Sequence, residues 1–240
     1  MKTKLKRFAA MSAYPNVVEP SFEEVFRTDY RMKGRWKEDF FGNGHPLVLE
    51  LGCGKGEYTV ALARKYPEKN FIGMDIKGAR MWVGATDALQ NRLNNAAFLR
   101  SRIEFILSCF APGEVSEIWI TFPDPQPQQS RLNKRLTSVR FLESYRTVLR
   151  PSGLIHLKTD SDSLFEYTRR VLLYNRLPVR WCTPDLYQSA LPDEILSVQT
   201  CYEKMFMAKG FSIKYLQFTV PAGSPLREPE EKTARNILAG

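Results

Sequence analysis

The chain has 240 residues and a mass of 27.7 kDa, and 43% of its residues are hydrophobic, so it can bury a substantial core without disulfides or structural metals. Lysine and arginine number 35 and aspartate and glutamate number 26, and the resulting net charge of +9 favours a polyanionic partner. No apolar run approaches the ~20 residues of a membrane-spanning helix. The cysteines form no CxxC pair and have no histidine ligands nearby, which argues against a zinc site and against a disulfide framework and predicts a reducing compartment. They are Cys53, Cys109, Cys182 and Cys201.

Apolar, β-branched runs alternate with helical stretches along the chain, a pattern typical of α/β proteins with a mostly parallel sheet. We expect strands at Leu47–Leu51, Asn70–Ile76, Ala96–Ile103, Glu117–Phe122, Gly153–Thr159, Val179–Thr183 and Phe211–Val220. Helices are expected at Glu57–Tyr66, Gly78–Arg92, Ser138–Leu149 and Leu164–Asn175. The sequence therefore predicts an α/β fold built on a seven-stranded, mostly parallel sheet.

The two ends of the chain lack this alternation. Residues 1–45 have a basic head and no clear period, so we expect an N-terminal basic arm ahead of a single domain at 46–220. Residues 221–240 contain three prolines and mixed charges, which predicts a flexible C-terminal tail. At the start of the last expected helix, Ser163 and Glu166 have the spacing of a capping box.

A glycine-rich loop follows the first buried strand. Glycines alternate as Gly52, Gly54 and Gly56, and a carboxylate, Glu50, precedes them. Neither the spacing nor the charge suits a dinucleotide pyrophosphate, whereas Glu50 suits a cationic ligand such as S-adenosylmethionine. Asp75 ends the next strand, where we expect it to accept both ribose hydroxyls. The alternative is a glycine turn in an unrelated α/β protein, with Asp75 capping a helix.

The fourth strand ends in Phe122-Pro123-Asp124-Pro125, which places an aspartate between two prolines at the same edge of the sheet. Because proline restricts both its own backbone and that of its predecessor, the direction of this carboxylate is largely set in advance. The following segment carries Arg131, Lys134 and Arg135 and no acid. It predicts a contact with a phosphate backbone, and the alternative is a solvated face.

Further motifs make a resemblance specific. They are Asn-Lys-Arg-Leu at 133–136, Leu-Lys-Thr-Asp at 157–160 and Thr-x-Tyr-Glu at 200–203. Together with the glycine loop, Asp75 and Phe-Pro-Asp-Pro, they resemble the bacterial tRNA (guanine-N7)-methyltransferase family from about Leu47 to Val220. The resemblance implies a Rossmann-like, class I methyltransferase that uses S-adenosylmethionine to methylate N7 of a guanosine in the tRNA variable loop. It also implies a cytoplasmic monomer or homodimer without a metal or membrane partner.

The resemblance assigns roles by motif position. Asp124 would be the catalytic residue. The cofactor would contact Glu50, Gly52, Gly54, Gly56, Asp75 and Asp124, with Arg102 at the position of an adenine-binding acid. The substrate would contact Gln128, Asp160, Thr200, Cys201, Tyr202 and Glu203, and the RNA would contact Arg131, Lys134 and Arg135.

Three residues depart from the family pattern: Gln126 replaces a common tryptophan, Gln128 a lysine and Arg102 an acid. They put the adenine contact and one substrate contact in doubt, and Glu104 is a candidate replacement for the lost acid.

The expected chemistry needs no strong base, because guanine N7 already carries a lone pair. Asp124 would orient cofactor and base and bear part of the developing charge, or would pair only with the cofactor amino group. Either Asp160 or Glu203 would accept the N1 and N2 protons of guanine. Two rival functions are a class I methyltransferase with a small-molecule or protein substrate, and a non-catalytic RNA-binding relative. His156 lies in an apolar strand and is interpreted as a core residue.

Overall fold

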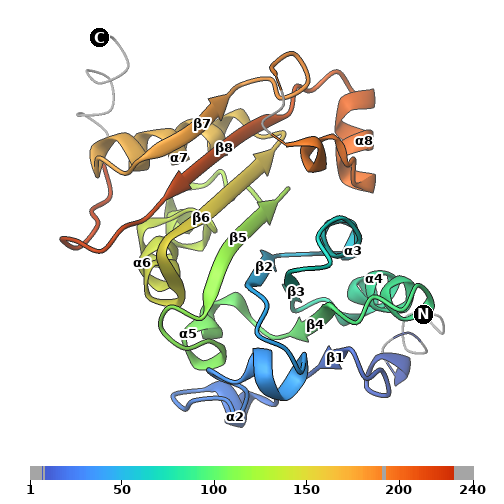
Figure 1. The fold of residues 1–240 in the computed structure, drawn as a ribbon. Coiled ribbons are helices and arrows are strands. Elements are labelled where there is room, and N and C mark those ends of the chain that lie inside the picture. The colour runs from blue at the N-terminus through green and yellow to red at the C-terminus, as the bar shows by residue number, and fades with distance from the viewer. Residues whose placement is uncertain (1–6, 8, 191–192, 230–240) are drawn as a thin grey trace.

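The computed structural model describes residues 7, 9–190 and 193–229. Their strands form one sheet in the order β1-β4-β3-β2-β5-β6-β8-β7 (Figure 1). The strands are β1 (Val17–Val18), β2 (Leu47–Leu51), β3 (Asn70–Asp75), β4 (Ala96–Arg100), β5 (Val115–Thr121), β6 (Leu149–Thr159), β7 (Val179–Thr183) and β8 (Lys214–Thr219). All pair in parallel except β8, which is antiparallel to both β6 and β7. The predicted α/β class is confirmed, but the sheet has eight strands instead of seven.

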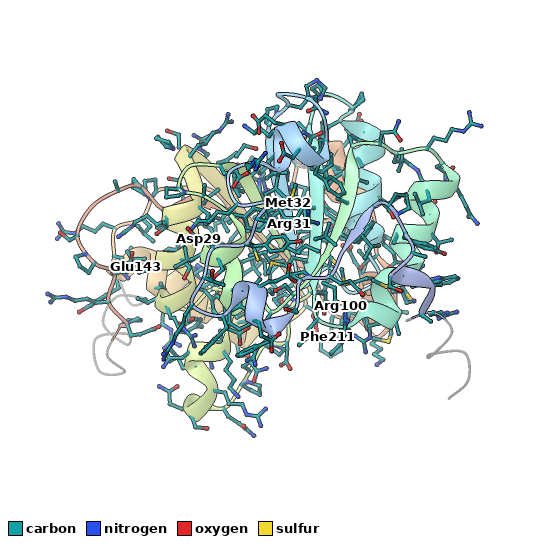
Figure 2. The ribbon with its side chains drawn as sticks, turned by 90° about the horizontal axis from the view of Figure 1, so that it is seen from below. Asp29, Arg31, Met32, Arg100, Glu143 and Phe211 are labelled. Carbon is teal, nitrogen blue, oxygen red and sulfur yellow. The ribbon has the colours of Figure 1, made fainter. Side chains whose placement is uncertain are left out.

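The eighth strand comes from the predicted N-terminal arm. Val17 and Val18 pair with Phe98 and Leu99 at the edge of the sheet. Further along, the Trp36 side chain is fully buried, and its indole N–H donates to the carbonyl of Cys109 at 2.8 Å. Seen from below, the segment that carries Asp29, Arg31 and Met32 lies across the molecule (Figure 2). The described part of this segment is therefore packed on the domain, while most of its basic head lies outside the described residues.

Helices cover both faces of the sheet. The longer ones are α3 (Glu57–Lys65), α4 (Gly78–Gln90), α6 (Val139–Val148), α7 (Asp162–Tyr174) and α8 (Cys201–Ala208). Shorter turns are α2 (Phe22–Val25), η1 (Trp36–Phe40), η2 (Ile103–Phe105), α5 (Ile106–Cys109), η3 (Gln129–Lys134) and η4 (Glu194–Ser197). One core cluster joins the sheet to α5, α6 and α7, and a second joins it to α3, α4 and η4. Leu47, Leu49 and Leu51 of β2 face the first cluster and Val48 faces the second, which explains why every residue of this strand except Glu50 is apolar.

One expectation about the C-terminal half needs correction, and part of the predicted tail contacts the domain. The helix α7 starts at Asp162, and Ser161 caps it by accepting from the amide of Leu164, so the predicted capping box of Ser163 and Glu166 is wrong. Residues 221–229 of the predicted flexible tail pack on the domain: Leu226 is buried, and Glu228 accepts from the Tyr167 hydroxyl at 3.0 Å. Residues 230–240 lie outside the described part of the chain.

Candidate active site

The carboxyl ends of β2, β3, β5 and β6 meet at one edge of the sheet, and the chain reverses its strand order between β2 and β5. In open α/β sheets, this switch point is where ligands bind. A cavity of about 730 Å³ lies there. Its lining includes the glycine loop, Asp75, Asp124, Asp160 and Tyr202.

The last glycine of the loop has no room for a side chain. Gly56 has φ +71°, and a Cβ at this position would lie 2.4 Å from the Phe98 ring. The loop also packs against α4, because a Cβ on Gly84 would lie 2.6 Å from the carbonyl of Lys55. The loop backbone is therefore held close to the cavity by α4 and by β4.

Asp75 ties this loop to the end of β3. Its two carboxylate oxygens accept from the amides of Gly54 and Lys77, both at 2.9 Å. Asp75 also lines a second cavity of about 700 Å³, whose walls include the aromatic rings of Phe22, Phe26 and Phe105. Asp75 borders both cavities, so an extended ligand could occupy the two cavities with its middle beside Asp75.

Glu50 lies at the floor of the first cavity and is 3% exposed. One carboxylate oxygen accepts from the amide of Thr59 at 2.8 Å and from its hydroxyl, and the other accepts from the Thr121 hydroxyl at 2.6 Å. Burial raises the pKa of Glu50 to about 7 despite these hydrogen bonds. A cationic group in the cavity would stabilise the ionised carboxylate. Sequence reasoning missed both threonines, because nothing in their local pattern indicates the contact.

Asp124 is exposed on a loop of unusual backbone geometry. Phe122 and Gln126, on either side, have left-handed φ values of +48° and +44°. The amide of Gln126 donates to the Asp124 carboxylate at 3.1 Å. Such conformations are costly for residues other than glycine and persist where surrounding contacts hold them.

Arg135 supplies part of that support. Its side chain donates to the carbonyls of Gln126 at 3.1 Å and Pro127 at 3.4 Å, and its guanidinium lies 4.4 Å from the Tyr167 ring centroid. Arg135 is 6% exposed, whereas Arg131 and Lys134 are exposed. The three basic residues predicted to contact RNA therefore occupy two different environments.

The start of α8 closes the first cavity from the other side. Thr200 and Tyr202 are in its lining, and so is Phe206, whose ring is stacked with that of Phe122 at 6.2 Å. The amide of Cys201 donates to Glu57 at 3.1 Å. Glu203 is fully buried beneath the helix and is absent from the lining.

The remaining predicted site residues are spread around the two cavities. Asp160 lines the first, where partial burial raises its pKa above the usual value. Arg102 and Glu104 line the second and form an ion pair of 3.2 Å. Gln128 is exposed at the start of η3, outside both linings.

Residues 7, 9–190 and 193–229 contain no group of three or more His, Cys, Asp or Glu side chains arranged to hold a metal ion. In the same part of the chain, no helix has the length and apolar character needed to cross a membrane. His156 is a core residue whose Nδ1 lies 2.8 Å from the Tyr215 hydroxyl.

The fold is similar to that of solved methyltransferases. The chain is similar to the 16S rRNA methyltransferase KamB, with a TM-score of 0.55 and 19% identity over 74% of this chain and 88% of that one. It is also similar to an antibiotic-related methyltransferase, with a TM-score of 0.57 and 14% identity over 76% of this chain and 90% of the other. The sheet topology and the glycine loop define a class I, S-adenosylmethionine-dependent methyltransferase fold.

Sequence comparison narrows this class. Residues 44–216 match a family model described as a putative methyltransferase. The tRNA (guanine-N(7)-)-methyltransferase of Bacteroides thetaiotaomicron is 53% identical over 95% of this chain and 90% of its own length. The enzymes of the same name from Porphyromonas gingivalis and Brevibacillus brevis are 50% and 36% identical, over 92% and 84% of this chain and 91% and 89% of their own lengths. The chain belongs to the tRNA (guanine-N7)-methyltransferase family.

Proposed function

We propose that the protein transfers a methyl group from S-adenosylmethionine to N7 of a guanosine in the variable loop of tRNA. The observation that carries the proposal is the pair of neighbouring cavities that share Asp75 in their walls, with the glycine loop, Asp124 and Asp160 lining one of them, in a chain of this family. Residues 46–220 would carry the catalytic groups, with Phe22 and Phe26 of the preceding segment completing the wall of the second cavity, and the protein would act in the cytoplasm.

The two cavities fit the shape and charge of this cofactor. Glu50 and the glycine loop would hold the positively charged end, and Asp75 would accept hydrogen bonds from the ribose hydroxyls. The aromatic walls around Phe22 and Phe105 would enclose the adenine. When bound, the cofactor supplies a methyl group on a positively charged sulfur.

The protein would then have to position the base against the cofactor and stabilise the charge that develops during methyl transfer. Because N7 has a lone pair, no residue has to remove a proton before methyl transfer. Asp124 would hold base and cofactor in line, which contributes several kcal/mol to lowering a barrier of this kind. Its carboxylate would also stabilise the positive charge that develops on the guanine ring. The left-handed turns at Phe122 and Gln126 fix the loop that presents it.

The tRNA would be held by exposed basic side chains beside the cavities. Arg131 is exposed on η3, and Lys134 is exposed and borders both cavities. Contacts of this kind to phosphates are salt-dependent. The net charge of +9 would support the approach of the polyanion.

The test is transfer of labelled methyl from S-adenosylmethionine to unmodified tRNA, with nucleoside analysis of the product. We expect 7-methylguanosine from the wild type and at least a hundredfold lower rate from Asp124→Ala, in line with the loss of a preorganised electrostatic group. Asp29→Asn removes a carboxylate that is 73% exposed and serves as the matched control. Cofactor binding without methylation of tRNA would refute the proposal in favour of another substrate or a non-catalytic role.

A further inference from the structure

A third cavity lies between α7 and the edge strand β7, away from the two cavities at Asp75 (Figure 1). Its volume is about 470 Å³, and small-molecule sites typically have volumes of about 300–1,000 Å³. Among the described residues, none lines both this cavity and either of the first two. The cavity begins at Arg169, in the second half of α7, whereas the start of that helix follows Asp160 at the candidate active site. It is therefore separate from the site of methyl transfer.

The inner wall of this third cavity is apolar. The pairing of β7 with β8 sets Cys182 opposite Leu216, and both line the cavity beneath α7. Leu173 is 53% exposed and Val179 is 45% exposed, which is unusual for large aliphatic side chains. A hydrocarbon placed here would remove both from water. The apolar lining residues are Leu172, Leu173, Leu177, Val179 and Leu216.

The remaining wall of the third cavity is positively charged. Arg169, Arg170 and Arg176 line it. Arg169 is neutralised by Glu166, whose carboxylate accepts from it at 2.9 Å. Across residues 7, 9–190 and 193–229, Arg170 and Arg176 form no ion pair, and no acidic side chain lines the cavity. Two guanidinium groups therefore remain available to an anion from outside.

This combination selects one class of ligand. In the part of the chain that the structure describes, no aromatic ring lines the third cavity, so a nucleobase would find no stacking surface. A second copy of the chain, packed through the same face, would bring the same arginines and repel the first. An anion with a hydrocarbon body satisfies both the leucines and the arginines, because guanidinium groups pair closely with carboxylates.

We propose that the third cavity binds a single-chain carboxylate of the fatty-acid class. Its hydrocarbon chain would lie against the leucines of α7 and Leu216 of β8, and its carboxylate would pair with the guanidinium groups of Arg170 and Arg176. This site is independent of the proposed methyl transfer, so its test uses no activity measurement.

The position of Cys182 provides the test. Its thiol is exposed and lines the cavity, whereas Cys201 is exposed outside this lining and the other two cysteines are buried. Alkylation by iodoacetamide is followed at each cysteine by mass spectrometry, at mildly alkaline pH because burial raises the pKa of the Cys182 thiol. Decanoate, kept below the concentration at which it aggregates, should slow alkylation of Cys182 by about fivefold or more, because a bound chain covers the thiol. The reaction of Cys201 should not change.

Two variants test the two halves of the site. Arg176→Gln removes a rim charge, and Leu173→Glu replaces an apolar wall with a like charge. Each should raise the dissociation constant of decanoate, measured from the protection of Cys182, by about fivefold or more. Arg92→Gln is the matched control for the first, because Arg92 follows the C-cap of α4 with φ +54° as Arg176 follows that of α7 with φ +52°. Leu107→Glu is the control for the second, since Leu107 is a helical leucine that is 41% exposed elsewhere.

The outcomes separate this proposal from its rivals. Protection by decanoate that both site variants weaken and both controls retain supports it. No protection at the highest monomeric concentration of decanoate overturns it, and so does equal protection by decyltrimethylammonium, which has the same chain and a positive charge. If phosphatidylglycerol vesicles or tRNA protect Cys182 and decanoate does not, this face binds a lipid surface or RNA instead. If removing residues 230–240 speeds alkylation of Cys182 and decanoate protects neither form, that segment is the occupant and the proposal is wrong.

Discussion

The buried carboxylate of Glu50 should make cofactor binding depend on pH. Its pKa is about 7 in the free protein against an ordinary value of 4.5, a difference of 7 − 4.5, or about 2.5 units. A cation beside it stabilises the ionised form, so binding expels a proton wherever the carboxyl group is protonated beforehand. If the cation restores the ordinary pKa, affinity for S-adenosylmethionine rises by up to roughly tenfold per pH unit between about 4.5 and 7 and levels off above pH 7, and the total rise from the acidic limit to this plateau is about 300-fold.

Isothermal titration calorimetry from pH 5 to pH 8 measures this slope. Near pH 6 it should also detect the release of about one proton per site when two buffers of different ionisation enthalpy are compared. Glu50→Gln removes the titrating group and should give a flat profile, while Glu57→Gln changes a neighbouring carboxylate of the same cavity and should keep the slope. An affinity that is constant across this range in the wild type, or the same slope in Glu50→Gln, would refute the reasoning.

Three further predictions concern packing, loop support and acid stability. Gly84→Ala pushes a Cβ onto the carbonyl of Lys55, so we expect the unfolding free energy to fall by about 1–3 kcal/mol and cofactor binding to weaken. The control is Gly44→Ala, which has open space around the new Cβ and should leave the thermal denaturation curve unchanged. Arg135→Lys should lower kcat and leave the salt dependence of the tRNA binding constant unchanged, whereas Arg131→Ala should reduce that salt dependence. A reduced salt dependence in Arg135→Lys would mean that Arg135 contacts a phosphate instead. Burial alone would raise the pKa of Glu117, but the hydrogen bonds with His156 and Trp119 and the charges of His156 and Lys69 together outweigh burial, and the pKa falls to about 2. This stabilisation is present above pH 4.5 and lost as the pH falls towards 2, so Glu117→Gln should cost about 3 kcal/mol at pH 7 and about 1 kcal/mol at pH 3 in urea unfolding.

The central part of the fold follows from local pattern. The strand β2 begins and ends as predicted, and α3, α4 and α6 start and end within two residues of expectation. These elements are buried on one or both faces, so their apolar periodicity reports directly on their environment. The glycine loop and Asp75 follow the same logic, because strand ends of a parallel sheet meet at one edge.

The rest depends on contacts between residues far apart in sequence. Val17–Val18 is too short to show a period and becomes a strand only because β4 lies beside it. Arg131 and Arg135 look equivalent in sequence, yet Tyr167 and two carbonyls bury only the second. The burial of Glu203 likewise depends on Lys158, which lies 45 residues earlier.

The pairing of β1 with β4 has a consequence for solubility. Without β1, β4 would be an open edge strand of the sheet, and its sequence, Ala96-Ala97-Phe98-Leu99, is apolar. An unpaired apolar edge is a template on which a second chain can add a strand. The opposite edge, β7, instead exposes the charged Arg180. Deleting the chain through the end of β1 would therefore open the sheet to edge-to-edge association, so the N-terminal segment protects the protein from aggregation as well as completing its core.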